Sequence, residues 1–226
     1  MTHAVIVFGI FPYVAIFLAI AVTIIRYVSK TYTWSSLSSQ FLENRRLFWG
    51  SVPFHYGIIL VLLGHFVGFL FPRELLAWNG VPWRLYILEA TGLVLGLLAL
   101  WGIIVLIARR IAGERVRVVT STMDVILLVV LLIQIGTGVG TAIFDRWGSS
   151  WYAGSAAPYL WSVLFFRPDI SLVANLPLLP QIHICGGFLV LALLPFTRLV
   201  HILSFPLPYL WRPHQVVIWN SRRKPS

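Results

Sequence analysis

The stretch VPFHYGIILVLLGHFVGFLF, residues 52–71, decides how this chain folds. It is apolar apart from two histidines, and an α-helix needs about 20 mostly apolar residues to cross a membrane. Four other stretches share this character, at roughly 5–28, 85–108, 125–144 and 181–205. The sequence therefore predicts an all-α integral membrane bundle of five transmembrane helices.

The composition also points to a membrane protein. Of 226 residues, 59% are hydrophobic and 11% are charged, whereas a soluble globular domain carries about 25% charged residues. A water-exposed surface could not be covered by so few charges. The chain has one cysteine, which excludes an intramolecular disulfide and the CxxCH motif that attaches c-type haem. The first apolar stretch lacks a basic leader and a small-residue cleavage site, so we expect it to be a retained helix.

The net charge of +10 indicates a membrane topology rather than nucleic-acid binding. Basic residues lie between the apolar stretches, and positive residues concentrate on the cytoplasmic side of membrane proteins. With five spans, most of the 17 Lys and Arg residues fall on one side, and the exceptions are Arg73, Arg84, Arg146 and Arg167. We therefore expect an outer N-terminus, a cytoplasmic C-terminus, a bacterial or archaeal cytoplasmic membrane and no nucleic-acid partner.

The long fourth connection, about 145–180, holds an apolar stretch at 158–166. This stretch is too short to cross a membrane. It is expected to lie along the outer surface, as an interfacial segment.

Four histidines lie inside two of the predicted spans, His55 and His65 in the second and His183 and His201 in the fifth. An ionisable side chain inside a membrane is costly and is a candidate functional residue. One isolated histidine is readily explained by a helix–helix hydrogen bond, but two pairs on two helices are harder to explain in that way. Few intramembrane carboxylates accompany them, which argues against a proton relay.

The spacing of the histidines sorts them by level. On regular helices, His183 and His201 point the same way about 27 Å apart, and His55 and His65 are about 15 Å apart. Because the second span runs outward and the fifth inward, each end of the bundle receives one histidine from each helix. Zinc usually takes three or four protein ligands, whereas two axial imidazoles complete a haem iron. Each level therefore suits one bis-histidine haem, although the unequal separations require a helix tilt or a His183 at the helix entry.

Glycines also mark the spans. Pairs four residues apart, at 64/68, 92/96 and 136/140, predict close helix packing or room for a flat cofactor. Gly57, Gly186 and Gly187 lie near the histidines and are expected to leave similar space. The glycine-rich run 136–140 sits in an apolar helix with no preceding strand, which excludes a nucleotide-binding loop.

With these histidines and several short motifs, the chain resembles the gamma subunit, or cytochrome b, of membrane-bound respiratory nitrate reductase. The motifs are Tyr32-Thr33-Trp34, Ser38-Ser39-Gln40, Phe54-His55, Gly64-His65-Phe66, Arg115-Val116-Arg117, Thr120-Ser121-Thr122 with Asp124, and Pro195-Phe196-Thr197-Arg198-Leu199-Val200-His201. The resemblance covers nearly the whole chain. Its specific part is the paired histidine spacing of 10 and 18 residues.

The resemblance implies two b-type haems. His55 and His201 would ligate the cytoplasmic haem, and His65 and His183 would ligate the outer haem. Residues 1–204 would form this dihaem domain.

The resemblance also implies a quinol site beside the outer haem, for which Gly64 and Arg84 are the candidate residues. The family carries a lysine in the connection before the third span, where the nearest cation here is Arg84. The implied partners are an iron–sulfur beta subunit and a molybdenum-containing catalytic alpha subunit. The basic, aromatic tail 205–226 is expected to dock them, or to bind anionic lipid.

The expected function is a quinol-oxidising subunit of a quinol:nitrate oxidoreductase in anaerobic respiration and nitrate assimilation. Electrons would pass from quinol through the outer and then the cytoplasmic haem to the iron–sulfur subunit, and nitrate would be reduced on the alpha subunit. Two alternatives stay open: a dihaem anchor of a hydrogenase or sulfite-reductase type of complex, and a cofactor-free transporter. The inverted repeats and broken helices typical of transporters are not evident in the sequence.

Overall fold

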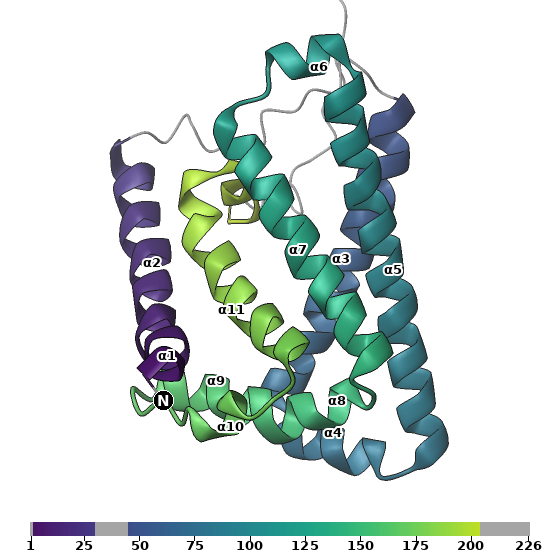
Figure 1. Ribbon diagram of the computed structural model, residues 1–226, viewed down its shortest axis with the longest axis vertical. Coiled ribbons are helices and arrows are strands. Elements are labelled where there is room, and N and C mark those ends of the chain that lie inside the picture. Colours follow the sequence, from purple (N-terminus) through teal and green to yellow (C-terminus); the bar gives the residue numbers. More distant parts are fainter. Residues whose placement is uncertain (1, 30–44, 204–226) are drawn as a thin grey trace, which may run out of the picture.

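The computed structural model describes residues 2–29 and 45–203, and within these ranges every regular element is helical (Figure 1). The elements are α1 Thr2–Ala4, η1 Val5–Ile10, α2 Phe11–Ser29, α3 Arg45–Leu70, α4 Pro72–Asn79, α5 Pro82–Ala112, α6 Glu114–Val118, α7 Thr122–Phe144, α8 Gly148–Trp151, η3 Tyr152–Ala156, α9 Ala157–Leu164, α10 Ser171–Ala174, α11 Leu178–Leu193, η4 Leu194–Phe196 and η5 Arg198–Ile202. The predicted docking tail 205–226 and the motifs at 32–34 and 38–40 lie outside the described residues.

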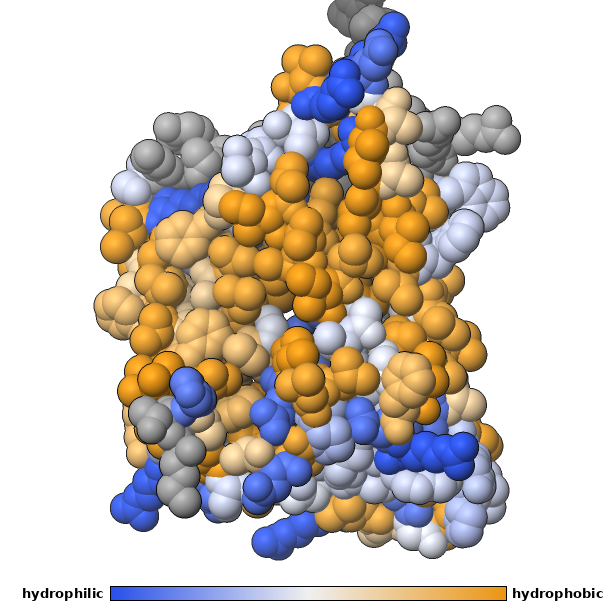
Figure 2. Space-filling model, in the orientation of Figure 1, coloured by the Kyte–Doolittle hydropathy of each residue, from blue (hydrophilic) through white to orange (hydrophobic). Residues whose placement is uncertain are grey.

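Among the described residues, five helices are long and apolar enough to cross a membrane, as predicted. They cover Val5–Ser29, Leu47–Leu70, Pro82–Ala112, Thr122–Phe144 and Leu178–Phe196. Hydrophobic side chains cover the middle of the visible face, and hydrophilic ones gather toward its two ends (Figure 2). An exposed apolar surface of this extent is what a bilayer would cover.

The two ends of the bundle differ. The short helix α6 lies at one end, and α4, α8, α9 and α10 lie together at the other (Figure 1); we call these the α6 end and the α4 end. The apolar stretch of the fourth connection forms α9 at the α4 end. Its Tyr159 is fully buried and donates a hydrogen bond to the Phe8 carbonyl at 2.8 Å, and burial raises the pKa of this phenol.

The closest helix contact joins α3 to α5 through glycine. A Cβ added to Gly57 would lie 2.6 Å from the Ala99 nitrogen, and one added to Gly102 would collide with the Phe54 backbone. Gly57 therefore serves packing and does not leave space beside the histidines. Such close backbone approach is the role of small residues between membrane helices.

The glycine pairs 64/68, 92/96 and 136/140 were expected to mark close helix packing or room for a flat cofactor, and the first member of each pair does not pack against another helix. An added Cβ would meet no heavy atom within 4 Å at Gly64, Gly92 or Gly136. The second member of each pair does pack closely, since an added Cβ would lie 2.9 Å from Leu75 at Gly68, 3.2 Å from Val139 at Gly96 and 3.3 Å from Leu179 at Gly140. Spacing therefore predicted close packing correctly for one glycine of each pair. The alternative expectation, room for a flat group, agrees with the open space at the first glycine of each pair.

The fifth span is not the continuous helix 181–205 that was expected. The α-helix α11 ends at Leu193, and two short 3₁₀ helices, η4 and η5, follow it. Pro195 lies in the first of them, and proline cannot donate to the helical ladder and clashes with the preceding turn. Thr197, between the two, is fully extended, with φ −118° and ψ −177°. The five-turn spacing of His183 and His201 on one helix is therefore wrong.

The break has a partner on another helix. Arg26 of α2 donates from Nη1 to the Pro195 carbonyl at 2.6 Å and to the Thr197 carbonyl at 3.4 Å. Carbonyls released by a helix break need such partners, because an unpaired backbone group in an apolar medium costs several kcal/mol, about the value of a lost hydrogen bond there.

Candidate functional site

The structure brings the four histidines together in two pairs, although His201 lies beyond the end of the candidate span Leu178–Phe196 and not inside a span as expected. The ring centroids of His55 and His201 are 6.5 Å apart at the α6 end, and those of His65 and His183 are 6.2 Å apart toward the α4 end. Helix α3 provides one member of each pair, α11 provides His183, and η5 provides His201. The helix break thus removes the problem of unequal separations, since His201 is not held at the regular helical rise from His183.

In each of the four histidines, the Nδ1 atom is hydrogen-bonded to a backbone carbonyl. The partners are the backbone carbonyls of Ser51 for His55 (2.7 Å), Val61 for His65 (2.8 Å), Gln134 for His183 (2.9 Å) and Arg198 for His201 (2.5 Å). A carbonyl can only accept, so Nδ1 carries the proton and Nε2 keeps its lone pair. A hydrogen bond from one ring nitrogen to a carbonyl typically orients an imidazole whose other nitrogen ligates a metal.

The distances fit one metal ion between the two rings of each pair. An imidazole nitrogen lies about 2 Å from a metal that it ligates, so two opposed ligating rings have centroids roughly 6 to 6.5 Å apart. Gly64, the residue before His65, faces open space, since an added Cβ there would meet no heavy atom within 4 Å beyond its chain neighbours. In the part of the chain that the structure describes, no group of three or more His, Cys, Asp or Glu is placed to hold a metal. The residues present therefore fit a bis-histidine haem better than zinc.

Helix α7 fixes His183 by contacts that the sequence analysis missed. Gln134 receives the His183 Nδ1 proton on its carbonyl and returns a hydrogen bond from Nε2 to the His183 carbonyl at 3.0 Å. A Cβ added to Gly138 would lie 2.7 Å from His183 Cε1, so this glycine makes room for the ring. A polar residue in an apolar span, followed by glycines, was the available signal.

Tyr152 is a second missed residue, and it lies against His65. Its hydroxyl donates to the His65 carbonyl at 2.8 Å, and its ring meets the imidazole edge-on at 5.1 Å. Burial raises the pKa of Tyr152 to about 12, so the phenol remains a neutral hydrogen-bond donor at physiological pH. Nothing in the spacing of the sequence connects a residue of the fourth connection to the second span.

The two candidate quinol residues, Gly64 and Arg84, do not contact each other. Arg84, in the first turn of α5, stacks over Trp78 at 4.9 Å and Trp83 at 5.5 Å. Among the described residues, no hydrogen bond, ion pair or ring contact joins Arg84 to Gly64 or His65. The indole rings hold this guanidinium at the α4 end.

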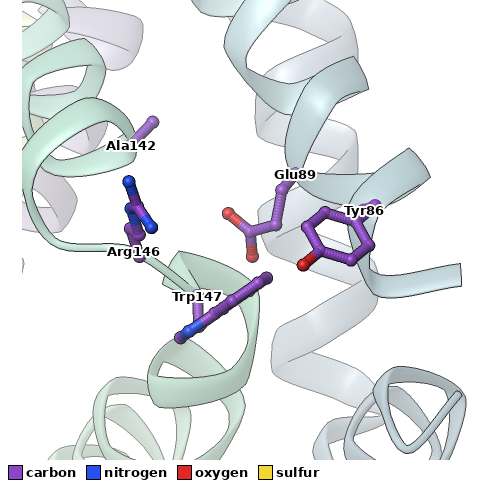
Figure 3. A pocket seen from close by; sticks show the side chains of 5 residues that line it. All are labelled: Tyr86, Glu89, Ala142, Arg146 and Trp147. Carbon is purple, nitrogen blue, oxygen red and sulfur yellow. The ribbon is translucent and has the colours of Figure 1, made fainter. Parts of the chain in front are cut away.

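A small hollow at the α4 end belongs to neither histidine pair (Figure 3). It measures about 200 Å³ and is lined by Tyr86, Glu89, Ala142, Arg146 and Trp147. The Glu89 carboxylate accepts hydrogen bonds from the Ser149 backbone nitrogen at 2.8 Å and hydroxyl at 2.6 Å. Glu89 thus ties α5 to α8 and is accounted for as a structural contact.

With the site described, similarity to known proteins decides the family. The nitrate reductase gamma subunit family matches residues 4–220. The chain belongs to this family.

Individual relatives agree over almost the full length. The chain is 36% identical to the nitrate reductase gamma chain of Bacillus subtilis (strain 168), over 96% of this chain and 98% of that protein. It is 34% identical to the respiratory nitrate reductase 2 gamma chain of Escherichia coli (strain K12), over 96% of each. The respiratory nitrate reductase 1 gamma chain of the same organism is 31% identical over 93% of this chain and 95% of its own length.

The family membership confirms the resemblance inferred from the sequence. As a gamma chain, the protein is a subunit of the respiratory nitrate reductase complex in the cytoplasmic membrane, and it takes part in respiratory electron transport. Gamma chains are generally b-type cytochromes, and the gamma designation implies alpha and beta subunits beside it.

Proposed function

We propose that this gamma chain oxidises quinol at the outer side of the membrane and delivers the electrons to an iron–sulfur beta subunit at the cytoplasmic side, for nitrate reduction on a molybdenum-containing alpha subunit. The observation that carries the proposal is the pair of histidine pairs, with centroids 6.5 and 6.2 Å apart and every Nδ1 bonded to a carbonyl. Two such pairs at different depths suit a route for electrons across the bilayer.

His55 and His201 would hold one haem b, and His65 and His183 would hold the other. When bound, the haems would supply one-electron carriers, and two histidines holding each iron would favour electron transfer over oxygen chemistry. The chain's own contribution is to bond each Nδ1 atom to a backbone carbonyl, which makes Nε2 the nitrogen that would hold the metal. The apolar spans around the rings exclude water and so favour a defined potential.

Charge supports the orientation in the membrane. Arg109, Arg110, Arg115 and Arg117 lie around the α6 end, and Arg198 joins them there. Positive residues concentrate on the cytoplasmic side, so the α6 end would face the cytoplasm and the N-terminus would be outside. The α6 end and the tail 205–226 would then dock the beta subunit, with residues 1–204 as the dihaem domain.

The quinol would bind near His65, on the outer side, where oxidation releases protons to the outside. Gly64 offers open space beside this histidine, and the Arg84 guanidinium would stabilise a quinol oxygen or a haem propionate. Membership of the gamma family favours this function over an anchor for a hydrogenase or sulfite-reductase type of complex, and over a transporter.

The test is the optical spectrum of the purified complex during reduction by a quinol analogue. Two b-type components with separate midpoint potentials should become reduced, and nitrate should reoxidise both. A complex without b-type absorbance, or one whose haem is not reduced by quinol, would overturn the proposal.

A further inference from the structure

Of the two histidines at the α6 end, His201 needs contacts from other helices to hold its imidazole in place, whereas His55 does not. His55 lies within the long helix α3, so the helix itself sets its direction. His201 lies in the five-residue 3₁₀ helix η5, after the break at Pro195. A 3₁₀ helix this short is a weak structure with poor hydrogen-bond geometry. Contacts from other helices must therefore hold the imidazole of His201 in place.

A bidentate ion pair between η5 and α7 is such a contact. Arg198 donates from Nε to Asp124 Oδ1 at 2.5 Å and from Nη2 to Asp124 Oδ2 at 2.8 Å. Asp124 is only 4% exposed. A bidentate guanidinium–carboxylate pair fixes direction as well as distance, because both groups are planar.

Asp124 is itself held rigidly. Its carboxylate accepts from the Ser121 backbone nitrogen at 3.0 Å, and the Ser121 hydroxyl accepts from the Asp124 nitrogen at 3.2 Å. These reciprocal bonds form a capping box at the start of α7. Arg110 of α5 donates to the same carboxylate at 3.2 Å. The acceptor for Arg198 is thus fixed to two transmembrane helices.

The chain of contacts ends on the imidazole. The carbonyl of Arg198 accepts the Nδ1 proton of His201 at 2.5 Å. Arg198 is therefore held by Asp124 through its side chain, and its backbone carbonyl in turn holds the imidazole of His201. Val200, between them in sequence, is fully buried and seals the same segment against the bundle.

We propose that Asp124 and Arg198 are positioning residues for the haem ligand His201, and that their ion pair sets the affinity and the potential of the haem at the α6 end. The inference rests on the proposed ligand role of His201. A stabilising role alone is a poor explanation for the pair, because an ion pair removed from water seldom adds net stability over apolar residues. Orienting the carbonyl that accepts the Nδ1 proton of His201 explains the geometry of the pair.

The test uses the full complex with Asp124→Asn, which removes the charge and one of the two acceptors. Second-shell changes typically weaken metal binding by about 10- to 100-fold. We expect loss, or a shifted midpoint potential and altered low-spin ferric EPR signal, for the haem at the α6 end alone. Glu89→Gln is the matched control, since Glu89 also joins two elements through its carboxylate but contacts no histidine. It should leave both haems unchanged.

A second variant covers the case in which Asp124→Asn fails to assemble. Arg198→Lys keeps the positive charge but loses the planar fork, so it should shift the same haem's potential and EPR signal in an assembled complex. Unchanged content, potential and EPR signal of that haem in an assembled Asp124→Asn or Arg198→Lys complex would overturn the inference. Failure of the proposed function is separate: wild-type complex would lack b-type haem, or His201→Ala would keep both haems.

Discussion

The two histidine pairs reach nearly the same separation by different means. At the α6 end, a ligand on a broken segment is held by a charged network of Asp124, Arg198 and Arg110. Toward the α4 end, His183 is held on a regular helix by neutral groups, Gln134 and the bare surface of Gly138. Charged groups thus hold His201, and uncharged groups hold His183.

Depth in the membrane explains the difference. Asp124 lies in the first turn of α7 and Arg110 in the last turn of α5, so the charged network sits at the ends of spans. Gln134 lies near the middle of α7. A charge near the bilayer centre costs at least about 2.5 kcal/mol, whereas the Gln134 amide is neutral and donates from Nε2 to the His183 carbonyl. Ions are therefore used at the ends of the spans, and amide and glycine near the middle of a span.

The largest effects should follow removal of the ligands themselves. His65→Ala or His183→Ala should remove the haem toward the α4 end and leave the other, and His55→Ala or His201→Ala should do the reverse. Each variant deletes one of the two axial nitrogens, so the complex should contain half of the wild-type haem. The measurement is haem content together with redox titration of the b-type absorbance. Retention of both haems in any of the four would break the assignment of the pairs.

A smaller effect is expected where α7 makes room for His183. Gly138→Val should displace the imidazole, because even a Cβ at this position would lie 2.7 Å from His183 Cε1. Overpacking costs about 1 to 3 kcal/mol, so we expect weaker retention of the haem toward the α4 end and a lower thermal midpoint of the complex.

Gly136→Val is the matched control on the same helix. An added Cβ at Gly136 meets no heavy atom within 4 Å, so this variant should disturb His183 less. Equal haem loss in both variants would show that helix propensity, rather than contact with the ring, is responsible. Loss confined to Gly136→Val would place the cofactor against that open surface.

The sequence was sufficient for the spans and for which histidines face each other. Apolar length predicts the five helices, and alternating direction pairs His55 with His201 and His65 with His183. It was insufficient for the helix end near Pro195, because Pro is tolerated inside other membrane helices, as Pro53 is in α3. Residues that position the ligands were also missed, since Tyr152 and Arg198 act through contacts between distant segments that no periodicity records.

The smallest effect is expected from Tyr152→Phe, which keeps the ring against His65 and removes the hydroxyl. The lost hydrogen bond to the His65 carbonyl, 2.8 Å in the wild type, is worth about 0.5 to 1.5 kcal/mol. We expect a slight fall in thermal midpoint and a small shift in the potential of the haem toward the α4 end, with the other haem unaffected.

Tyr152 also predicts how the stability of the protein depends on pH. Burial raises the pKa of Tyr152 to about 12, so the folded chain keeps this proton more tightly than the unfolded chain, whose tyrosine titrates near pH 10. Its contribution to stability is therefore complete below about pH 10 and is lost as the pH rises toward 12. Stability measured by thermal unfolding should fall less steeply above pH 10 in Tyr152→Phe than in wild type. An identical fall in both would mean that the hydroxyl is not held in this contact, and the neutral anchoring of His65 would then rest on α3 alone.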